Sequence, residues 1–281
     1  MKLFVHGGVS GLDKELPPIA HAVAAASSTS TALDAVERAV FALEDDPNVN
    51  AGFGAVLNLA GAIELDAGIA DGVTMRSGAV TSVKVRHPIV LARRVMETTP
   101  HVFMAGPGAM RLGLDLETMT TSSDEQGARW SQAREDGTLT PDHFGAPQHV
   151  DTVGAIALDD VGNLVAGSST GGVFGKLPGR VGDACVFGAG FYASPAAAVM
   201  GTGVGELFIE CFACARVGLA IESGIHPQRA CEDVIEMMGT RQASTAGLIA
   251  LNRTGQVGAA FRGGALRVEG LDGPVEPKRL A

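Results

Sequence analysis

The chain has 281 residues, which is enough for a large buried core. Its composition, with 46% hydrophobic and only 19% charged residues, excludes a disordered polypeptide. A net charge of −10 without a basic cluster argues against nucleic acid or an anionic membrane as a partner. No apolar run reaches the roughly 18 residues of a membrane span, and the start is unlike a signal peptide, so we expect a cytoplasmic protein.

The amino-terminal part of the chain is predicted to form a strand over residues 1–8 and then two helices. Residues 16–26 are apolar and rich in alanine, which favours the first helix. Thr31 and Asp34 have the spacing of a capping box, which opens a second helix that ends before Pro47. The loop after it is acidic and rich in turn residues.

The middle of the chain alternates between strand and helix signals. Residues 55–85 carry alternating β-branched residues between glycines, which indicates several antiparallel strands. Residues 136–150 have the composition of a polar linker. Between these segments the pattern predicts helices over 88–96, 109–114 and 123–134, and a short strand over 101–105.

The most informative stretch spans residues 149–183. Two apolar runs, 153–158 and 163–166, flank an acidic turn, which is typical of paired strands. The first strand begins after Thr152, and the second leads to Ser169 and Thr170. Arg180 and Asp183 follow on a loop rich in glycine and proline. Hydroxyls beside an Arg/Asp pair predict a site for a small molecule.

The carboxyl-terminal part is predicted to be layered. Its helix over 206–222 is apolar almost all round, so it is buried in the fold or at a subunit interface. The last ten residues have the composition of a loose tail. Strands are expected over 184–189, 196–200, 248–251 and 257–261, with a helix over 227–238. The element order favours an α+β fold.

Five short motifs stand in the order and at the spacing of one known family. The chain resembles the plant-type asparaginases and isoaspartyl peptidases, which are N-terminal-nucleophile hydrolases. This resemblance implies a four-layer αββα sandwich formed by one domain over residues 1–281. The motifs are Asn-Ala-Gly-Phe-Gly-Ala-Val at 50–56, Asp-Thr-Val-Gly at 151–154, Ser-Thr-Gly-Gly at 169–172, Gly-Arg-Val-Gly-Asp at 179–183 and Thr-Gly-Val-Gly-Glu at 202–206.

A threonine nucleophile explains why such a protein needs no Ser-His-Asp arrangement. A threonine hydroxyl attacks only when a base takes its proton. The free α-amine of an amino-terminal threonine has a pKa of roughly 7.7–8.0 and can be that base. The resemblance therefore implies that the chain cuts itself between Asp151 and Thr152. The products would be an α chain of residues 1–151, ending in the linker (about 136–151), and a β chain of residues 152–281.

The resemblance also assigns roles to individual residues. Thr152 would attack the side-chain amide of L-asparagine or of a β-aspartyl dipeptide and release L-aspartate through a β-aspartyl ester. Arg180 would bind the substrate α-carboxylate, and Asp183 with the Gly205 carbonyl would bind its α-ammonium. The remaining roles fall on Asn50 (the oxyanion of self-cleavage), Thr170 (tuning of the nucleophile), and Thr202 Oγ with the Gly203 amide (the oxyanion hole for the substrate).

The family further implies a structural Na⁺ or K⁺ ion, no organic cofactor, and a homo-oligomer of the (αβ)2 type. Main-chain carbonyls suit such a hard cation. The matching carbonyls here belong to Leu43, Glu44, Asp46, Val49, Ala51 and Phe53. The chain departs from the family around residues 243–247 and at Arg262, which leaves the leaving group of the substrate open.

Other interpretations remain beside this one. A glycosylasparaginase-like amidase of the same superfamily and an uncleaved, non-catalytic scaffold are two of them. Residues 167–171 read Gly-Ser-Ser-Thr-Gly, which matches the nucleophile elbow of serine esterases, although the glycines that follow disfavour the required helix. Cys211 and Cys214 form a CxxC motif, but without a second pair we expect buried thiols, together with Cys185 and Cys231.

Overall fold

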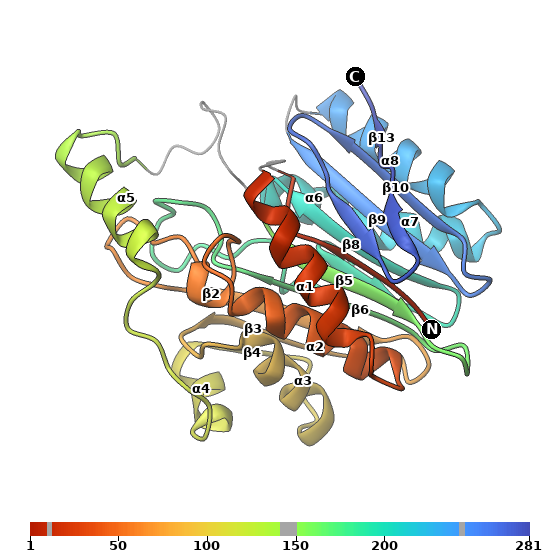
Figure 1. Ribbon diagram of the computed structural model, residues 1–281, viewed down its shortest axis with the longest axis horizontal. Coiled ribbons are helices and arrows are strands. Elements are labelled where there is room, and N and C mark those ends of the chain that lie inside the picture. The colour runs from red at the N-terminus through yellow and green to blue at the C-terminus, as the bar shows by residue number, and fades with distance from the viewer. Residues whose placement is uncertain (10–12, 141–150, 242–244) are drawn as a thin grey trace.

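The computed structural model describes residues 1–9, 13–140, 151–241 and 245–281. Two β-sheets stack face to face, with helices covering the outer face of each (Figure 1). One helical layer packs on β5 and β6 of the first sheet, and another packs on β8, β9 and β10 of the second. Contacts of β5 and β6 with β8 join the two sheets. These layers confirm the predicted four-layer αββα sandwich.

The first sheet has eight strands in the order β12-β11-β1-β5-β6-β2-β3-β4. Its central strands run antiparallel, and Val153 of β5 lies opposite Ser169 of β6. Its strands are β1 (Lys2–His6), β2 (Leu65–Asp71), β3 (Arg76–Val83), β4 (Phe103–Ala105), β5 (Val153–Leu158), β6 (Leu164–Thr170), β11 (Val268–Gly270) and β12 (Gly273–Val275).

The second sheet has five strands in the order β13-β10-β9-β8-β7. Its strands are β7 (Phe191–Ala193), β8 (Ala197–Gly203), β9 (Ala246–Asn252), β10 (Val257–Arg262) and β13 (Lys278–Arg279). The helices are α1 (Leu16–Ala26), α2 (Ala32–Glu44), α3 (Pro88–Thr98), α4 (Gly106–Met110), α5 (Asp124–Glu135), α6 (Gly205–Cys211), α7 (Ala213–Glu222) and α8 (Pro227–Arg241).

The central strands are covered on both faces, which explains their composition. Every residue of β5, β6 and β8 is buried. A strand with two buried faces needs no alternation of polar and apolar residues, so its sequence is a continuous apolar or small-residue run. One face of β5 packs against α2 with Val153 and Ala155, while Ile156 packs between the two sheets. The amino end of β5 is thereby fixed on both sides.

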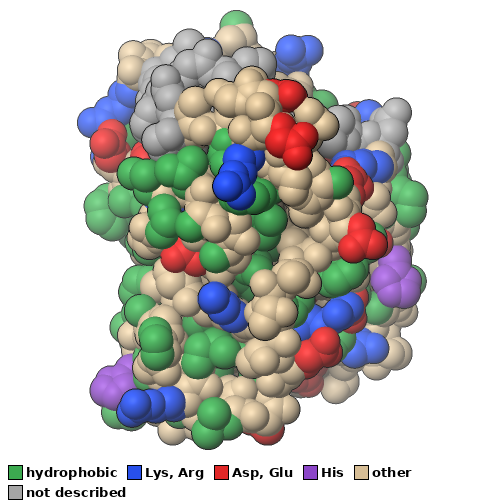
Figure 2. All heavy atoms as spheres, turned by 90° about the vertical axis from the view of Figure 1, so that its left-hand side faces the viewer, with side chains coloured by type: hydrophobic (Ala, Val, Ile, Leu, Met, Phe, Trp, Pro, Cys, Tyr) green, Lys and Arg blue, Asp and Glu red, His purple; other side chains and the backbone are tan. Residues whose placement is uncertain are grey.

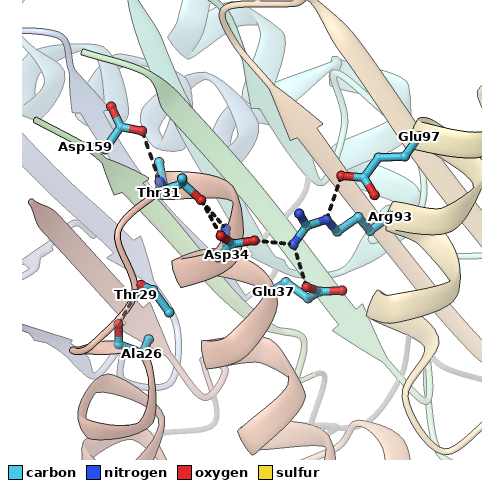
Figure 3. Close-up of polar contacts among 9 residues, drawn as sticks. Ala26, Thr29, Thr31, Asp34, Glu37, Arg93, Glu97 and Asp159 are labelled. Carbon is cyan, nitrogen blue, oxygen red and sulfur yellow. Dashed lines mark hydrogen bonds and ion pairs between the residues drawn. The ribbon is translucent and has the colours of Figure 1, made fainter. Parts of the chain in front are cut away.

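Polar contacts fix the start of α2, as the sequence predicts. Thr31 Oγ1 accepts a hydrogen bond of 3.1 Å from the Asp34 amide, which confirms the predicted cap. The Asp159 carboxylate, in the turn after β5, accepts a hydrogen bond of 3.1 Å from the Ala32 amide. Arg93 of α3 contacts carboxylates of α2 and of its own helix, namely those of Asp34, Glu37 and Glu97 (Figure 3).

Several predicted elements are wrong or need correction. Residues 184–189 form turns instead of a strand, because hydrogen bonds such as Val186 N to Asp183 O (2.8 Å) close the chain on itself. The predicted helix 206–222 is split at Phe212, whose left-handed backbone (φ 49°) ends α6. The final residues are no loose tail, because β12 and β13 pair with β11 and β10. Residues 55–85 contribute only β2 and β3.

The outer surface carries mixed charges. On the face that includes α4 and α5, Figure 2 shows acidic and basic side chains interspersed among hydrophobic ones. In the described part of the chain, no helix is long and apolar enough to cross a membrane. Most of the predicted linker, residues 141–150, lies outside the described residues, and so does part of the departing segment 243–247.

Candidate active site

Thr152 lies at the amino end of β5, between the ends of strands from both sheets. Only 5% of it is exposed. The register of β5 and β6 brings Thr170, the last residue of β6, to the same end of the first sheet. From the second sheet, Thr202 Oγ1 of β8 accepts a hydrogen bond of 3.2 Å from the Thr152 amide. Three threonines, one just before β5 and one each at the ends of β6 and β8, therefore meet at one buried place.

The carbonyl oxygen of Asp151, just before Thr152, receives two side-chain hydrogen bonds. Asn50 Nδ2 donates over 3.0 Å and Thr170 Oγ1 over 3.1 Å. The Val56 amide donates to Asn50 Oδ1, which fixes the orientation of the Asn50 carboxamide. Two donors aimed at one carbonyl are placed to stabilise negative charge that develops on its oxygen. In the continuous chain, Thr170 thus contacts the carbonyl that precedes Thr152, the predicted nucleophile.

The two glycines after β6 leave room for this arrangement. An ideal Cβ at Gly171 would lie 2.6 Å from Asn50 Oδ1, so no larger residue fits there. Gly172 has φ +82°, donates its amide to Thr170 Oγ1 (3.0 Å) and accepts a bond of 2.7 Å from Asn50 Nδ2. Gly172 therefore contacts both side chains that donate to the Asp151 carbonyl, Thr170 and Asn50, and helps to fix their positions.

Arg180 and Asp183 lie beside Thr152 and line one small cavity with it. This cavity, of about 10 Å³, is also bordered by Gly203 and Asp151. Arg180 Nε and Nη2 each donate a bond of 2.8 Å to the carboxylate of Glu206. Within the described ranges, Arg180 Nη1 has no hydrogen-bond partner, so one end of the guanidinium remains available to a ligand.

Asp183 is a buried carboxylate without full compensation. It is 3% exposed, and its Oδ2 has no hydrogen-bond partner among the described residues. Burial raises the pKa of Asp183 to about 7, although the Arg180 guanidinium acts in the opposite direction. An ideal Cβ at Gly205 would lie 2.7 Å from Asp183 Oδ1, so the start of α6 packs directly on this carboxylate. The charged groups that border the cavity, Arg180 and Asp183, complement one carboxylate and one ammonium group.

Sequence reasoning missed two parts of this site. Glu206 closes the last family motif, but nothing in the motif indicates that it holds Arg180. Lys176 is only 1% exposed, and its Nζ donates a bond of 2.9 Å to the Glu64 carbonyl behind the site. Burial lowers the pKa of Lys176, while the buried Asp66 carboxylate opposes this effect. A single lysine in a loop sequence gives no signal of such burial.

The residues of the predicted cation loop lie around two glycines. An ideal Cβ at Gly54 would lie 2.2 Å from the Val49 carbonyl oxygen and 2.7 Å from that of Asp46. At Gly52 (φ +49°) it would lie 2.2 Å from the Glu44 carbonyl oxygen. These carbonyls lie so close to the two glycines that no side chain fits there. Carbonyl oxygens are ligands that suit a hard cation. Four of the predicted carbonyls, those of Leu43, Val49, Ala51 and Phe53, accept amide hydrogen bonds from Asp46, Ala51, Gly54 and Ser123 respectively.

Two of the alternative interpretations disagree with the geometry. A nucleophile elbow must turn directly from strand into helix, but Ser169 lies inside β6 and the next helix is α6, at Gly205–Cys211. The four cysteines are buried and free, as predicted. Among the described residues, no group of three or more His, Cys, Asp or Glu side chains could hold a metal ion.

Comparisons with known proteins point to one family. A family model described as asparaginase matches residues 7–268. An isoaspartyl peptidase of Salmonella typhimurium is 44% identical, over 82% of this chain and 78% of that protein. A mouse isoaspartyl peptidase/L-asparaginase is 38% identical, over 89% of this chain and 82% of its own length. A plant-type L-asparaginase of Pyrococcus abyssi is 36% identical over 92% of both.

Proposed function

Since the chain belongs to the asparaginase family, we propose that it is a threonine amidohydrolase that cleaves the side-chain amides of L-asparagine and β-aspartyl dipeptides. One observation carries this proposal. The carbonyl before Thr152 is held by Asn50 Nδ2 and Thr170 Oγ1, while the Arg180/Asp183 cavity borders the same threonine. A nucleophile beside a receptor for an α-amino acid is what hydrolysis of an asparagine side chain requires.

The first step is self-cleavage. Thr152 Oγ attacks the Asp151 carbonyl carbon, and the hydrogen bonds from Asn50 and Thr170 stabilise the charge on its oxygen. The peptide C–N bond breaks, the Thr152 nitrogen takes a proton, and an ester remains. Water then hydrolyses this ester. The products are the Asp151 carboxylate of an α chain and the free amine of Thr152.

The second reaction uses that amine. It accepts the proton of the Thr152 hydroxyl, which attacks the β-carbonyl carbon of the substrate. Thr202 Oγ1, 3.2 Å from the Thr152 nitrogen, lies where it can donate to the new oxyanion together with the Gly203 amide. The leaving group of the substrate, ammonia or an amino acid, takes the proton from the Thr152 amine and departs. Water then hydrolyses the β-aspartyl ester to L-aspartate. Arg180 and Asp183 hold the α-carboxylate and α-ammonium throughout.

The direct test is release of L-aspartate by purified, cleaved protein. L-Asparagine and a β-aspartyl dipeptide are incubated with the protein, and the α-aspartyl dipeptide of the same composition is the control. We expect aspartate from the first two and none from the control, because only a β-amide places its carbonyl at Thr152 with both α-groups bound. If fully cleaved protein released aspartate from neither β-amide, the proposed function would be rejected.

The pKa of Asp183 predicts how ligand binding depends on pH. Below its value of about 7 the carboxyl group is protonated and no longer attracts an ammonium group. Lowering the pH from about 8 to about 6 should therefore weaken binding of L-aspartate, measured as a competitive inhibitor, by about tenfold. Succinate, which lacks the ammonium group, is the control. Equal weakening of both inhibitors would assign the effect to another group.

We also propose a Na⁺ or K⁺ ion at the loop of Gly52 and Gly54. The carbonyl oxygens of Glu44, Asp46 and Val49 support it, since they lie close to these two glycines and a hard cation prefers oxygen ligands. The ion would fix the loop that leads to Asn50. Exchange of Na⁺ and K⁺ for choline at constant ionic strength should lower the thermal unfolding midpoint, and NaCl should restore it. An unchanged midpoint would argue against the ion.

The proposal extends to assembly as a dimer of αβ units in the cytoplasm. Large hydrophobic side chains that are exposed in one copy support assembly, because partners cover such groups. The four buried, unpaired thiols are typical of a reducing compartment. Light scattering tests the assembly, because a dimer of αβ units has twice the mass of one 28.7 kDa chain. The exposed side chains near the split between α6 and α7 are Phe187, Phe212 and Leu219.

A further inference from the structure

A second, larger cavity meets the small Thr152 cavity at Asp151. Its volume is about 240 Å³, and it is bordered by Asp151 and Asn50. The small cavity, of about 10 Å³, contains Thr152, Arg180 and Asp183 and is bordered by the same Asp151. A substrate held by its α-groups at Arg180 and Asp183 must extend its leaving group away from them. Because Asp151 borders both cavities, the larger one is a neighbouring space for such a leaving group.

The larger cavity presents two basic side chains. Arg129 of α5 lies with its guanidinium 4.1 Å from the centre of the Phe174 ring, which fixes its orientation. Lys14 Nζ lies 3.0 Å from Glu125 Oε1 and is therefore already paired. For Arg129, no hydrogen bond or ion pair is found with the residues that the structure describes. Arg129 is thus the basic group that can accept a new carboxylate.

A carboxylate already lies at this cavity in the continuous chain. The Asp151 side chain borders it, and Asp151 Oδ1 accepts a hydrogen bond of 3.0 Å from the Val9 amide. Burial lowers the pKa of Arg129, and the nearby carboxylates of Glu125 and Asp151 oppose this effect. Asp151 is also the residue that self-cleavage releases from Thr152. Its departure would remove one of these two carboxylates from Arg129.

A neutral acceptor lines the same cavity. Gln126 is 7% exposed, and its Oε1 has no hydrogen-bond partner among the described residues. An unpartnered buried acceptor is costly unless a ligand or water satisfies it. An amide N–H of a bound peptide would satisfy it. The cavity thus offers a cation and an acceptor, which are the complements of a carboxylate and an N–H group.

We propose that this cavity binds the leaving amino acid of a β-aspartyl dipeptide. Arg129 pairs with the free α-carboxylate of that amino acid, which takes the place that the Asp151 carboxylate has in the continuous chain. The inference rests on the proposed hydrolase function and specifies its substrate. Two further acidic residues, Glu125 on α5 and Glu15, line this cavity with Arg129, and they disfavour a second negative charge on the ligand. A leaving group with one carboxylate and an uncharged side chain is therefore preferred. Asparagine, whose leaving group is ammonia, gains nothing from the cavity.

The test compares three substrates at constant ionic strength: β-aspartyl-alanine, its C-terminal amide, and L-asparagine. For the unmodified enzyme we expect kcat/KM to be about tenfold higher for the acid than for the amide, since the acid alone can pair with Arg129. In Arg129→Gln this ratio should fall to about one, and the ratio of β-aspartyl-alanine to asparagine should fall about tenfold. Arg134→Gln, on the same helix but outside the cavity, should change neither ratio.

Three results would overturn the inference. An enzyme that hydrolyses the acid and the amide equally well does not recognise the carboxylate. An Arg129→Gln enzyme that loses activity on all three substrates in proportion shows that Arg129 supports the fold. If Arg129→Gln does not fold, Lys14→Met should still lower the acid-to-amide ratio, because it frees the Glu125 carboxylate, four residues before Arg129 on α5, to pair with Arg129 in place of the substrate. An unchanged ratio would reject the cavity. Enzyme that releases aspartate from none of the substrates would reject the proposed function itself, and this inference with it.

Discussion

Replacement of Thr152 by alanine is expected to leave one uncut chain of 28.7 kDa without measurable hydrolase activity. In the proposed mechanism both reactions need the same oxygen atom, because Thr152 Oγ attacks the Asp151 carbonyl during self-cleavage and the substrate afterwards. The loss of a nucleophile typically costs roughly 10⁴–10⁶ in kcat. The uncut variant also lacks the free amine that would serve as the base. Intact mass measurement and aspartate release read the two effects separately.

Thr152→Ser is the matched control for this experiment. It keeps a hydroxyl on residue 152, next to the Asp151 carbonyl that Asn50 holds, so it should still cleave, at a reduced rate. Amino-terminal sequencing of its smaller fragment should begin at position 152. Cleavage of Thr152→Ala between residues 151 and 152 would show that another group attacks this bond, and the proposed mechanism would then be wrong.

Replacement of Arg180 by lysine is expected to separate the two reactions. Glu206 occupies Nε and Nη2 of Arg180, which leaves Nη1 for the substrate carboxylate. Lysine has a single nitrogen and cannot serve both partners in this geometry. We expect kcat/KM for asparagine to fall by about 10²-fold, mainly through KM. Self-cleavage should continue nearly unchanged, because the Asp151 carbonyl depends on Asn50 and Thr170.

Arg216→Lys is a suitable comparison for Arg180→Lys. Arg216 is an exposed residue of α7 that also uses its guanidinium to hold the chain, donating to the Cys211 carbonyl, and it does not line the cavity. The time course of cleavage and the kinetics on asparagine are measured for both variants. If Arg180→Lys slowed cleavage as much as it weakened hydrolysis, Arg180 would act mainly on the structure of the loop.

The parts of the fold that depend on neighbouring residues were predictable. The cap of α2 depends on Thr31 and Asp34, three residues apart, and it forms as expected. The strands around Asp159 form because two apolar runs flank a turn, which Gly162 closes with a bond of 3.0 Å to the Asp159 carbonyl. The segment 184–189 was mispredicted because its apolar residues pack around a closed loop beside Asp183, an environment that strand propensity does not describe.

The sequence by itself determined the family, the four layers and the position of Thr152 before a buried strand, because these depend on motif order and on local hydrophobic patterns. Only the tertiary structure brings Asn50 to the Asp151 carbonyl across 101 residues, and Glu206 to Arg180 across 26. The same holds for the cavity in which Arg129 faces Asp151. These contacts join separate elements through the stacking of two sheets. Burial then sets the chemistry of the site, raising the pKa of Asp183 by removing water from its carboxylate, and no local pattern of residues specifies that desolvation.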